Sequence, residues 1–113
     1  MDADVRLRLS AQRALLTHVT PSMRAVSVEI QPADRVVWMR FVFDGEPSPD
    51  AREVASCAHT EVLSDFADEW SVELEVIACR APGRMAHRRW QVYHRCEDTW
   101  VQDARPSSPD PTA

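Results

Sequence analysis

The chain has no lysine, only two glycines and only three cysteines among its 113 residues. All thirteen basic side chains are therefore arginine, which we attribute to GC-rich codons rather than to a binding function. Two isolated glycines, Gly45 and Gly83, cannot form a glycine-rich loop around phosphates, so this class of nucleotide-binding enzyme is excluded. An odd number of cysteines argues against a disulfide framework and predicts reduced thiols.

Long apolar runs are also missing, since no stretch approaches the roughly 20 residues that span a bilayer. The first residues, MDADVRLRLS, have neither the basic start nor the apolar core of a secretory signal. We therefore expect a cytoplasmic protein with no membrane contact. Residues 1–101 are predicted to form a single domain, and residues 102–113 lack the apolar side chains needed to offset the entropy of ordering, which predicts a disordered tail.

The first half of the chain predicts one helix and two strands. Asp2 or Asp4 can cap a helix that runs to about His18. Its larger apolar side chains lie on or near one face: Val5, Leu9, Leu15, Leu16 and Val19. Alternating apolar residues over 23–30 and 35–43, joined by a tight turn, predict a β-hairpin. The second of these strands is apolar on both faces and should be central in its sheet.

The second half predicts another helix and two further strands. Ser48 at the N-cap, Pro49 at the first helical position and Asp50 in the first turn mark a helix that continues to about Phe66. One stripe should pack on the core: Ala51, Val54, Ala55, Ala58, Val62 and Phe66. Residues 70–79 and 87–96 read as a second hairpin with a longer loop. The order α-β-β-α-β-β predicts an α+β fold: a four-stranded, mainly antiparallel sheet with two helices packed on one face.

Acidic residues concentrate on the second predicted helix and its flanks, where Arg52 is the only arginine. Ten acids lie in this segment: Asp44, Glu46, Asp50, Glu53, Glu61, Asp65, Asp68, Glu69, Glu73 and Glu75. Their field attracts a cationic surface and repels phosphate-bearing ligands. The segment is either a solvated helix face or a docking surface for a basic partner, and the uncompensated like charge favours docking.

Catalysis and metal binding find less support. Glu53, Glu61 and Asp68 project outward along the helix instead of converging in a cleft, so an enzyme using carboxylates such as Asp44 and Glu46 ranks below the other hypotheses. Cysteines and histidines occur in no closely spaced pair that points the same way on a helix. We predict no enzymatic activity, no metal and no other cofactor.

Residues 80–95 form a second charged segment, with five arginines and no acid. A single-stranded RNA ligand is the alternative function, with this candidate site: Arg84, Arg88, Arg89, Trp90 and Tyr93. We favour cross-strand ion pairs of Arg89 and Arg95 with Glu73 and Glu75, because the predicted hairpin places them side by side and the chain has a net charge of −5. Direct nucleic-acid contact is therefore not expected.

Several short motifs resemble a known family. They are Arg24 at the opening strand, the Phe43-Asp44-Gly45-Glu46 turn before a Pro/Ser-led helix, and Thr60-Glu61 with Ser64-Asp65-Phe66 at the end of that helix. Over residues 19–96 the sequence resembles small immunity proteins of bacterial toxin–immunity systems, including contact-dependent growth inhibition. The resemblance implies an intracellular, non-enzymatic inhibitor that binds a cognate toxin C-terminal domain, often a nuclease with a basic surface.

The acidic segment and this resemblance agree on a toxin inhibitor. The predicted partner-binding residues are Asp44, Glu46, Glu53, Glu61, Asp65, Asp68, Glu69 and Trp70. Trp70 follows the acidic run and is either an interface anchor or a core residue at the start of a strand. The oligomeric state is left open by the sequence.

Overall fold

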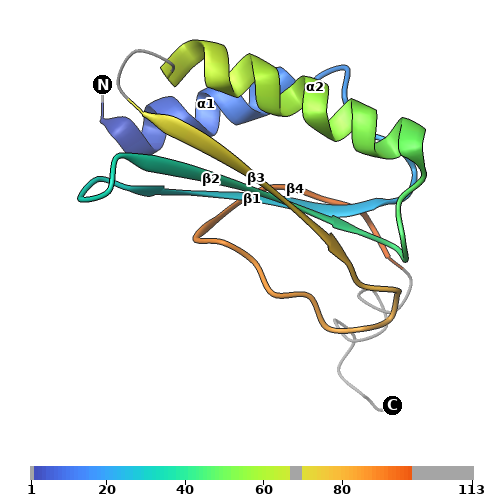
Figure 1. The fold of residues 1–113 in the computed structure, drawn as a ribbon. Helices are drawn as coiled ribbons and strands as arrows, with labels where there is room; N and C mark the ends of the chain where they lie inside the picture. Colours follow the sequence, from blue (N-terminus) through green and yellow to red (C-terminus); the bar gives the residue numbers. More distant parts are fainter. Residues whose placement is uncertain (1, 67–69, 98–113) are drawn as a thin grey trace.

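The computed structural model describes residues 2–66 and 70–97 and confirms the predicted α+β fold. In chain order the elements are α1 (Ala3–Leu15), β1 (Met23–Gln31), β2 (Val36–Phe43), α2 (Pro49–Phe66), β3 (Ser71–Ala78) and β4 (Trp90–His94). Both helices lie side by side on one face of the sheet (Figure 1). Asp68, Glu69 and the predicted tail at residues 102–113 lie outside the described residues.

The sheet is mixed, with the strand order β3-β2-β1-β4. β1 pairs antiparallel with β2 and with β4, whereas β3 pairs parallel with β2. The predicted second hairpin is therefore wrong, because β3 and β4 lie at opposite edges of the sheet. The physical reason is that α2 carries the chain back along the sheet, so the strand that follows it runs parallel to β2 as in a βαβ crossover.

Residues 79–89 connect the two edges by crossing the sheet face that the helices leave uncovered (Figure 1). The backbone N–H of Arg88 donates to Ser27 Oγ of β1 at 2.8 Å. Arg40 Nη1 of β2 donates to the carbonyl oxygen of Ala86 at 3.0 Å. This connection is therefore bonded to the two central strands, and the helical layer is left as the other broad face of the domain.

The core lies between the sheet and the helices. β2 is central, as predicted, and its Val37, Met39 and Phe41 are fully buried. From α2 the same core receives small side chains such as Ala55 and Ala58, both with no exposed surface. Small residues let the helix approach the sheet closely, which fixes the spacing of the two layers.

α1 packs through a different face from the one that its larger apolar residues mark. Leu7, Ala11 and Ala14 are buried at no more than 1% exposure, whereas Leu9 is 48% and Leu16 81% exposed. Of the apolar residues grouped on the predicted face, Leu15 alone is buried. The predicted face was wrong because two of the five buried residues of α1 are alanines, which close helix–sheet approach selects over larger side chains.

The N-terminus of α2 is capped as predicted. Ser48 Oγ accepts a hydrogen bond from the backbone N–H of Ala51 at 3.1 Å. We expect Ser48→Ala to lower the free energy of unfolding by about 1 kcal/mol, the usual cost of losing a serine cap. Urea unfolding followed by circular dichroism measures this, with Ser48→Asp as the control that keeps a capping oxygen. Equal stability of all three proteins would show that the cap is dispensable.

Candidate partner-binding surface

The outer side of α2 carries the predicted acidic row, which we define as Asp50, Glu53 and Glu61. All three side chains are exposed. Within the described part of the chain, Asp50 and Glu53 form no ion pair, and Glu53 accepts only a weak hydrogen bond from Cys57 Sγ at 3.7 Å. Their charge is therefore directed to solvent.

Glu61 and Glu46 have local, solvated partners. Glu61 Oε2 lies 3.5 Å from His18 Nδ1. That nitrogen is also 2.7 Å from the carbonyl oxygen of Ala14, to which it donates its proton. Glu46, in the loop between β2 and α2, pairs with Arg52. Exposed pairs of this kind contribute little to stability and are easily exchanged for a partner's cation.

Asp65 has a structural role instead, because it joins the two helices. Its Oδ2 accepts from Ser10 Oγ at 2.5 Å and from Arg13 Nη2 at 2.7 Å. The bond from Ser10 and then the Arg13 guanidinium hold the pKa of Asp65 below its usual range, against the opposing effect of burial. Its carboxylate is thus neutralised within the chain and is poorly placed to bind a second cation.

Asp44 is likewise engaged internally. It accepts from the backbone N–H of Ala81 at 2.9 Å and from Arg95 Nη2 at 3.0 Å. These two contacts, the Ala81 bond first, lower the pKa of Asp44. The residue therefore ties the end of β2 to the connection that leaves β3 and to the end of β4.

Beneath Asp44 lies a buried ion pair between Arg24 and Glu97, which are 2% and 8% exposed. Arg24 Nε and Nη2 each donate to a Glu97 oxygen at 2.7 Å. Arg24 Nη1 donates to the carbonyl oxygens of Cys79 at 2.8 Å and Gly83 at 2.9 Å. Arg24 belongs to the motifs singled out in the sequence, whereas Glu97 does not. The available signal was an arginine inside an apolar strand, which requires a buried acid elsewhere.

Trp70 lies half-buried at the start of β3, where it packs against the core. The guanidinium of Arg35 is 5.7 Å from its ring centroid. Of the two predicted roles for Trp70, this position fits packing at the strand start better than an exposed anchor.

Glu75 does form ion pairs, but not with the predicted arginines. Its carboxylate accepts from Arg88 at 2.9 and 3.0 Å and from Arg40 at 3.0 Å. Arg88 first and then Arg40 hold the pKa of Glu75 below its usual range. The predicted pairs with Arg89 and Arg95 are wrong, because their strand lies at the far edge of the sheet from β3.

The arginine and aromatic side chains proposed for RNA are largely engaged with each other and with the sheet. The Arg88 guanidinium lies 4.5 Å from the Trp38 ring centroid. Arg8 and Arg89 lie over the Trp90 ring at 4.3 and 5.0 Å. Trp90 and Tyr93 also pack partly against the core. An RNA base could stack on these aromatic rings only by displacing the arginines and the core contacts. Arg84 differs from the other candidate residues, because its side chain is exposed.

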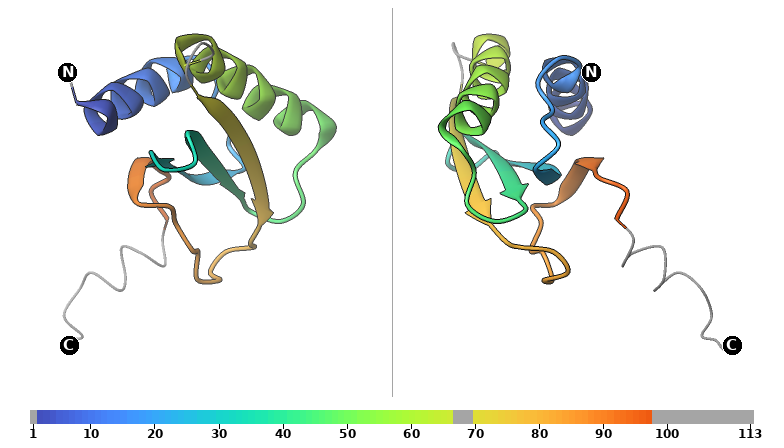
Figure 2. Two further views of the ribbon diagram at one scale, coloured as in Figure 1. Left: turned by 60° about the vertical axis from the view of Figure 1, so that its left-hand side comes forward. Right: turned by 90° about the vertical axis from the view of Figure 1, so that its right-hand side faces the viewer.

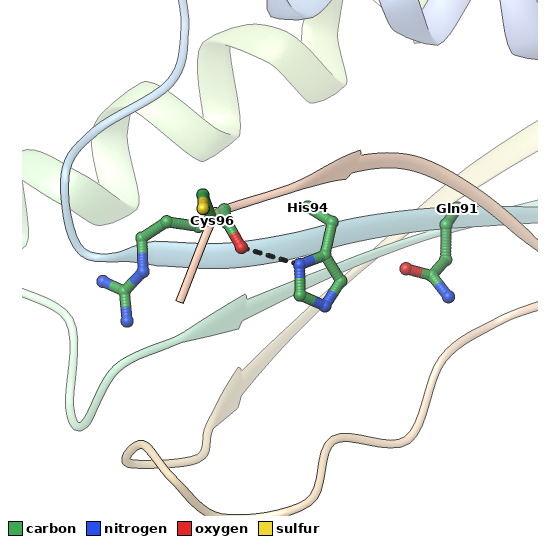
Figure 3. Close-up of a pocket in the computed structure, with 4 residues that line it drawn as sticks. Gln91, His94 and Cys96 are labelled. Atoms are coloured by element: carbon green, nitrogen blue, oxygen red, sulfur yellow. Dashed lines mark hydrogen bonds between the residues drawn. The ribbon is translucent and has the colours of Figure 1, made fainter. Parts of the chain in front are cut away.

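A pocket beside the end of β4 is lined by Gln91, His94, Arg95 and Cys96 (Figure 3). His94 Nδ1 donates to the carbonyl oxygen of Arg95 at 2.8 Å. The Cys96 sulfur points away from the imidazole ring (Figure 3). The pocket therefore contains no assembled thiol–imidazole pair of the kind that activates a cysteine nucleophile.

Residues 2–66 and 70–97 contain neither a metal-binding cluster nor a membrane-spanning helix. That part of the chain holds no group of three or more His, Cys, Asp or Glu side chains able to bind a metal ion. Neither of its helices combines the length and the apolar character needed to cross a bilayer.

The fold and surfaces together define a small α+β binding domain whose helical layer presents acids to solvent. A family model described as "MafI2 immunity protein" matches residues 4–97, and the chain belongs to this family. It is therefore an immunity protein of a polymorphic toxin system, and this family implies a non-enzymatic inhibitor that neutralises a toxin. The family does not single out contact-dependent growth inhibition.

Other comparisons add less. No curated protein matched the chain. Among solved structures, a chain described as "MamM CTD - Copper form" is similar at 14% identity and a TM-score of 0.43, over 76% of this chain and 92% of that chain. So low a TM-score carries no implication for function.

Proposed function

We propose that this immunity protein neutralises its toxin by placing the acidic row of α2 over a basic toxin surface, such as the nucleic-acid site of a nuclease. The observation that carries the proposal is the exposure of Asp50 and Glu53 without an ion pair in the described part of the chain. A row of carboxylates occupies the positions that phosphates would otherwise take on such a surface. Its field also accelerates association with a cationic partner.

Ion pairs within this chain separate the predicted partner residues into those that contact the toxin and those that stabilise the fold. Glu53 and Glu61 contact the toxin directly, and Glu46 extends the row at the start of α2. Asp44 and Asp65 hold the scaffold, because both are bound to arginines of this chain. Asp68 and Glu69, which lie outside the described residues, and Trp70 remain proposed contacts.

Co-expression with the toxin domain encoded by the neighbouring upstream gene tests the proposal. A stable complex and rescue of growth are the expected results. Failure of both would remove the proposed function altogether.

Charge reversal tests the acidic row itself. We expect Glu53→Arg/Glu61→Arg to weaken toxin binding by at least about tenfold and to abolish growth rescue, because close charge pairs across interfaces are strongly coupled. Asp34→Arg/Glu73→Arg is the matched control, since it changes the net charge equally at two exposed acids outside the helices. Isothermal titration calorimetry at low and high salt measures the effect, which should shrink as salt rises. Equal binding by both double variants would make the row a solvated face only.

A further inference from the structure

An exposed apolar stripe, defined by Val5, Leu9 and Leu16, lies on the outward side of α1 and on the C-cap residue that follows it. These side chains are 36%, 48% and 81% exposed. At about 100° per residue they lie within roughly 40° of one another around the helix axis. The opposite side of α1 buries Leu7 and Ala11 in the core. The helix thus turns its larger apolar side chains to solvent.

The exposure of several large apolar side chains on α1 indicates an interaction surface. Single exposed apolar residues are common, whereas several large ones on the same side of one helix are typical of interaction surfaces. Three of the five exposed large apolar residues in the described part of the chain belong to the stripe, and Val19, at 41% exposure, follows shortly after its end. Leu16, at 81% exposure, contributes little to the core of the domain, whereas Val5 and Leu9 are partly buried.

The stripe and the acidic row are parts of one surface. α1 and α2 lie side by side over the same sheet face (Figures 1 and 2). A shallow groove between them is lined by Leu9 of the stripe and by the Arg13–Asp65 pair. At the other end, His18 lies two residues beyond Leu16 and contacts Glu61 of the acidic row. The apolar stripe and the acidic row therefore lie on neighbouring helices of one layer, and Glu61 is the member of the row that contacts the segment after α1.

We propose that the α1 stripe is the apolar centre of the toxin-binding surface and that the acidic row is its charged flank. This inference rests on the proposed function. The partner it fits is a toxin domain that carries apolar side chains beside a basic patch. Specific interfaces have this anatomy, in which apolar side chains supply most of the affinity while charges supply rate and selectivity.

Charge argues for a toxin over a second copy of this chain. A symmetric pair formed through the helical layers would bring two acidic rows into one interface. The chain has a net charge of −5, so that contact would be opposed by repulsion, whereas a basic toxin gains attraction.

The test is toxin binding by Leu9→Ser/Leu16→Ser. We expect at least about a 30-fold weaker Kd, because truncation at the centre of an interface removes the contacts that dominate affinity. The loss should be nearly independent of salt, unlike that of Glu53→Arg/Glu61→Arg. Ile77→Ser is the matched control: this β3 side chain is 39% exposed and belongs to neither helix. Thermal melting of each variant shows that the domain remains folded.

Each outcome decides between the two proposals. If the wild type binds and only the serine variant weakens binding, the stripe is supported and the acidic row is not. If only the charge variant weakens binding, the stripe inference is overturned while the proposed function stands. If the wild type is a dimer, and the serine substitutions dissociate it without changing toxin affinity, the stripe mediates self-association. That outcome would also overturn the stripe inference. A wild type that fails to bind the toxin overturns both.

Discussion

Replacing Arg24 with methionine is expected to lower the free energy of unfolding by about 3–5 kcal/mol, the usual cost of removing one partner of a buried ion pair. The Glu97 carboxylate, only 8% exposed, would lose two hydrogen bonds of 2.7 Å and keep the one from Arg95 Nη2 at 3.0 Å. The carbonyl oxygens of Cys79 and Gly83 would also lose a donor. Urea denaturation at neutral pH measures the change.

Two further variants separate the buried pair from an ordinary surface pair. Arg52→Met removes the exposed partner of Glu46 and should cost no more than about 1 kcal/mol. Arg24→Met/Glu97→Leu should recover part of the stability lost in the single variant, because no unpaired charge remains buried. A single Arg24→Met variant as stable as Arg52→Met would contradict the assigned role of the network.

The contacts of Arg24 stabilise a domain in which two connections cross the sheet, one between β2 and β3 and one between β3 and β4. Arg24 lies at the start of β1, and its partners come from the segment after β3 and from Glu97, three residues after the end of β4. Arg95 extends the network to Asp44 and to the carbonyl oxygen of Pro21. A single buried guanidinium thus joins both edges of the sheet at one end of the domain.

The domain is also expected to lose stability in acid. Partner contacts lower the pKa values of four carboxylates: Asp44, Asp65, Glu75 and Glu97. A carboxylate with a lowered folded pKa stabilises the fold at a pH above its unfolded value, and this contribution is lost as pH falls through the folded pKa. The stability that these carboxylates contribute should therefore begin to fall below about pH 4.5, near the ordinary pKa values of carboxyl groups.

His87 acts in the same direction at higher pH. Burial, and then the nearby His94, lower the pKa of its imidazole. Protonation therefore disfavours the folded state once pH falls below the ordinary histidine value of about 6.5. As pH falls, stability should therefore decline slightly as His87 is protonated, and then steeply as the carboxylates are protonated.

Differential scanning calorimetry from about pH 7 to about pH 3.5 tests this expectation. A Tm lower by about 10 °C at the acid end corresponds to a loss of about 2 kcal/mol for a domain of this size. Glu75→Gln should have a lower Tm at neutral pH and a smaller drop in acid, since it cannot lose the pairs with Arg88 and Arg40 a second time. A Tm independent of pH would contradict the assigned ion pairs.

Local signals predicted the elements well. The Ser48-Pro49-Asp50 start fixed α2, because capping depends on residues within one helical turn. Alternation across residues 23–43 predicted β1, β2 and their antiparallel pairing, because a short turn leaves two neighbouring strands few other arrangements. The double-sided apolar pattern of β2 predicted its central position for the same local reason.

The errors arose where distant segments compete for the same place. β3 and β4 were paired because they are neighbours in sequence, yet the edges of the β1–β2 hairpin offered a separate position to each. The sequence also gives no sign that Asp44 and Asp65 pair with Arg95 and Arg13, because these arginines lie about 50 positions away in the chain. No periodicity encodes such contacts.

By itself, the sequence determined the number, type and order of the elements and the acidity of α2, because these depend on side-chain chemistry and on spacing within a few residues. The tertiary structure alone decided which acids remain exposed, which face of α1 packs, and where β4 lies. These depend on which surfaces close packing brings together. The surface proposed to bind the toxin consists of the acids and apolar side chains of the helical layer that remain exposed after folding.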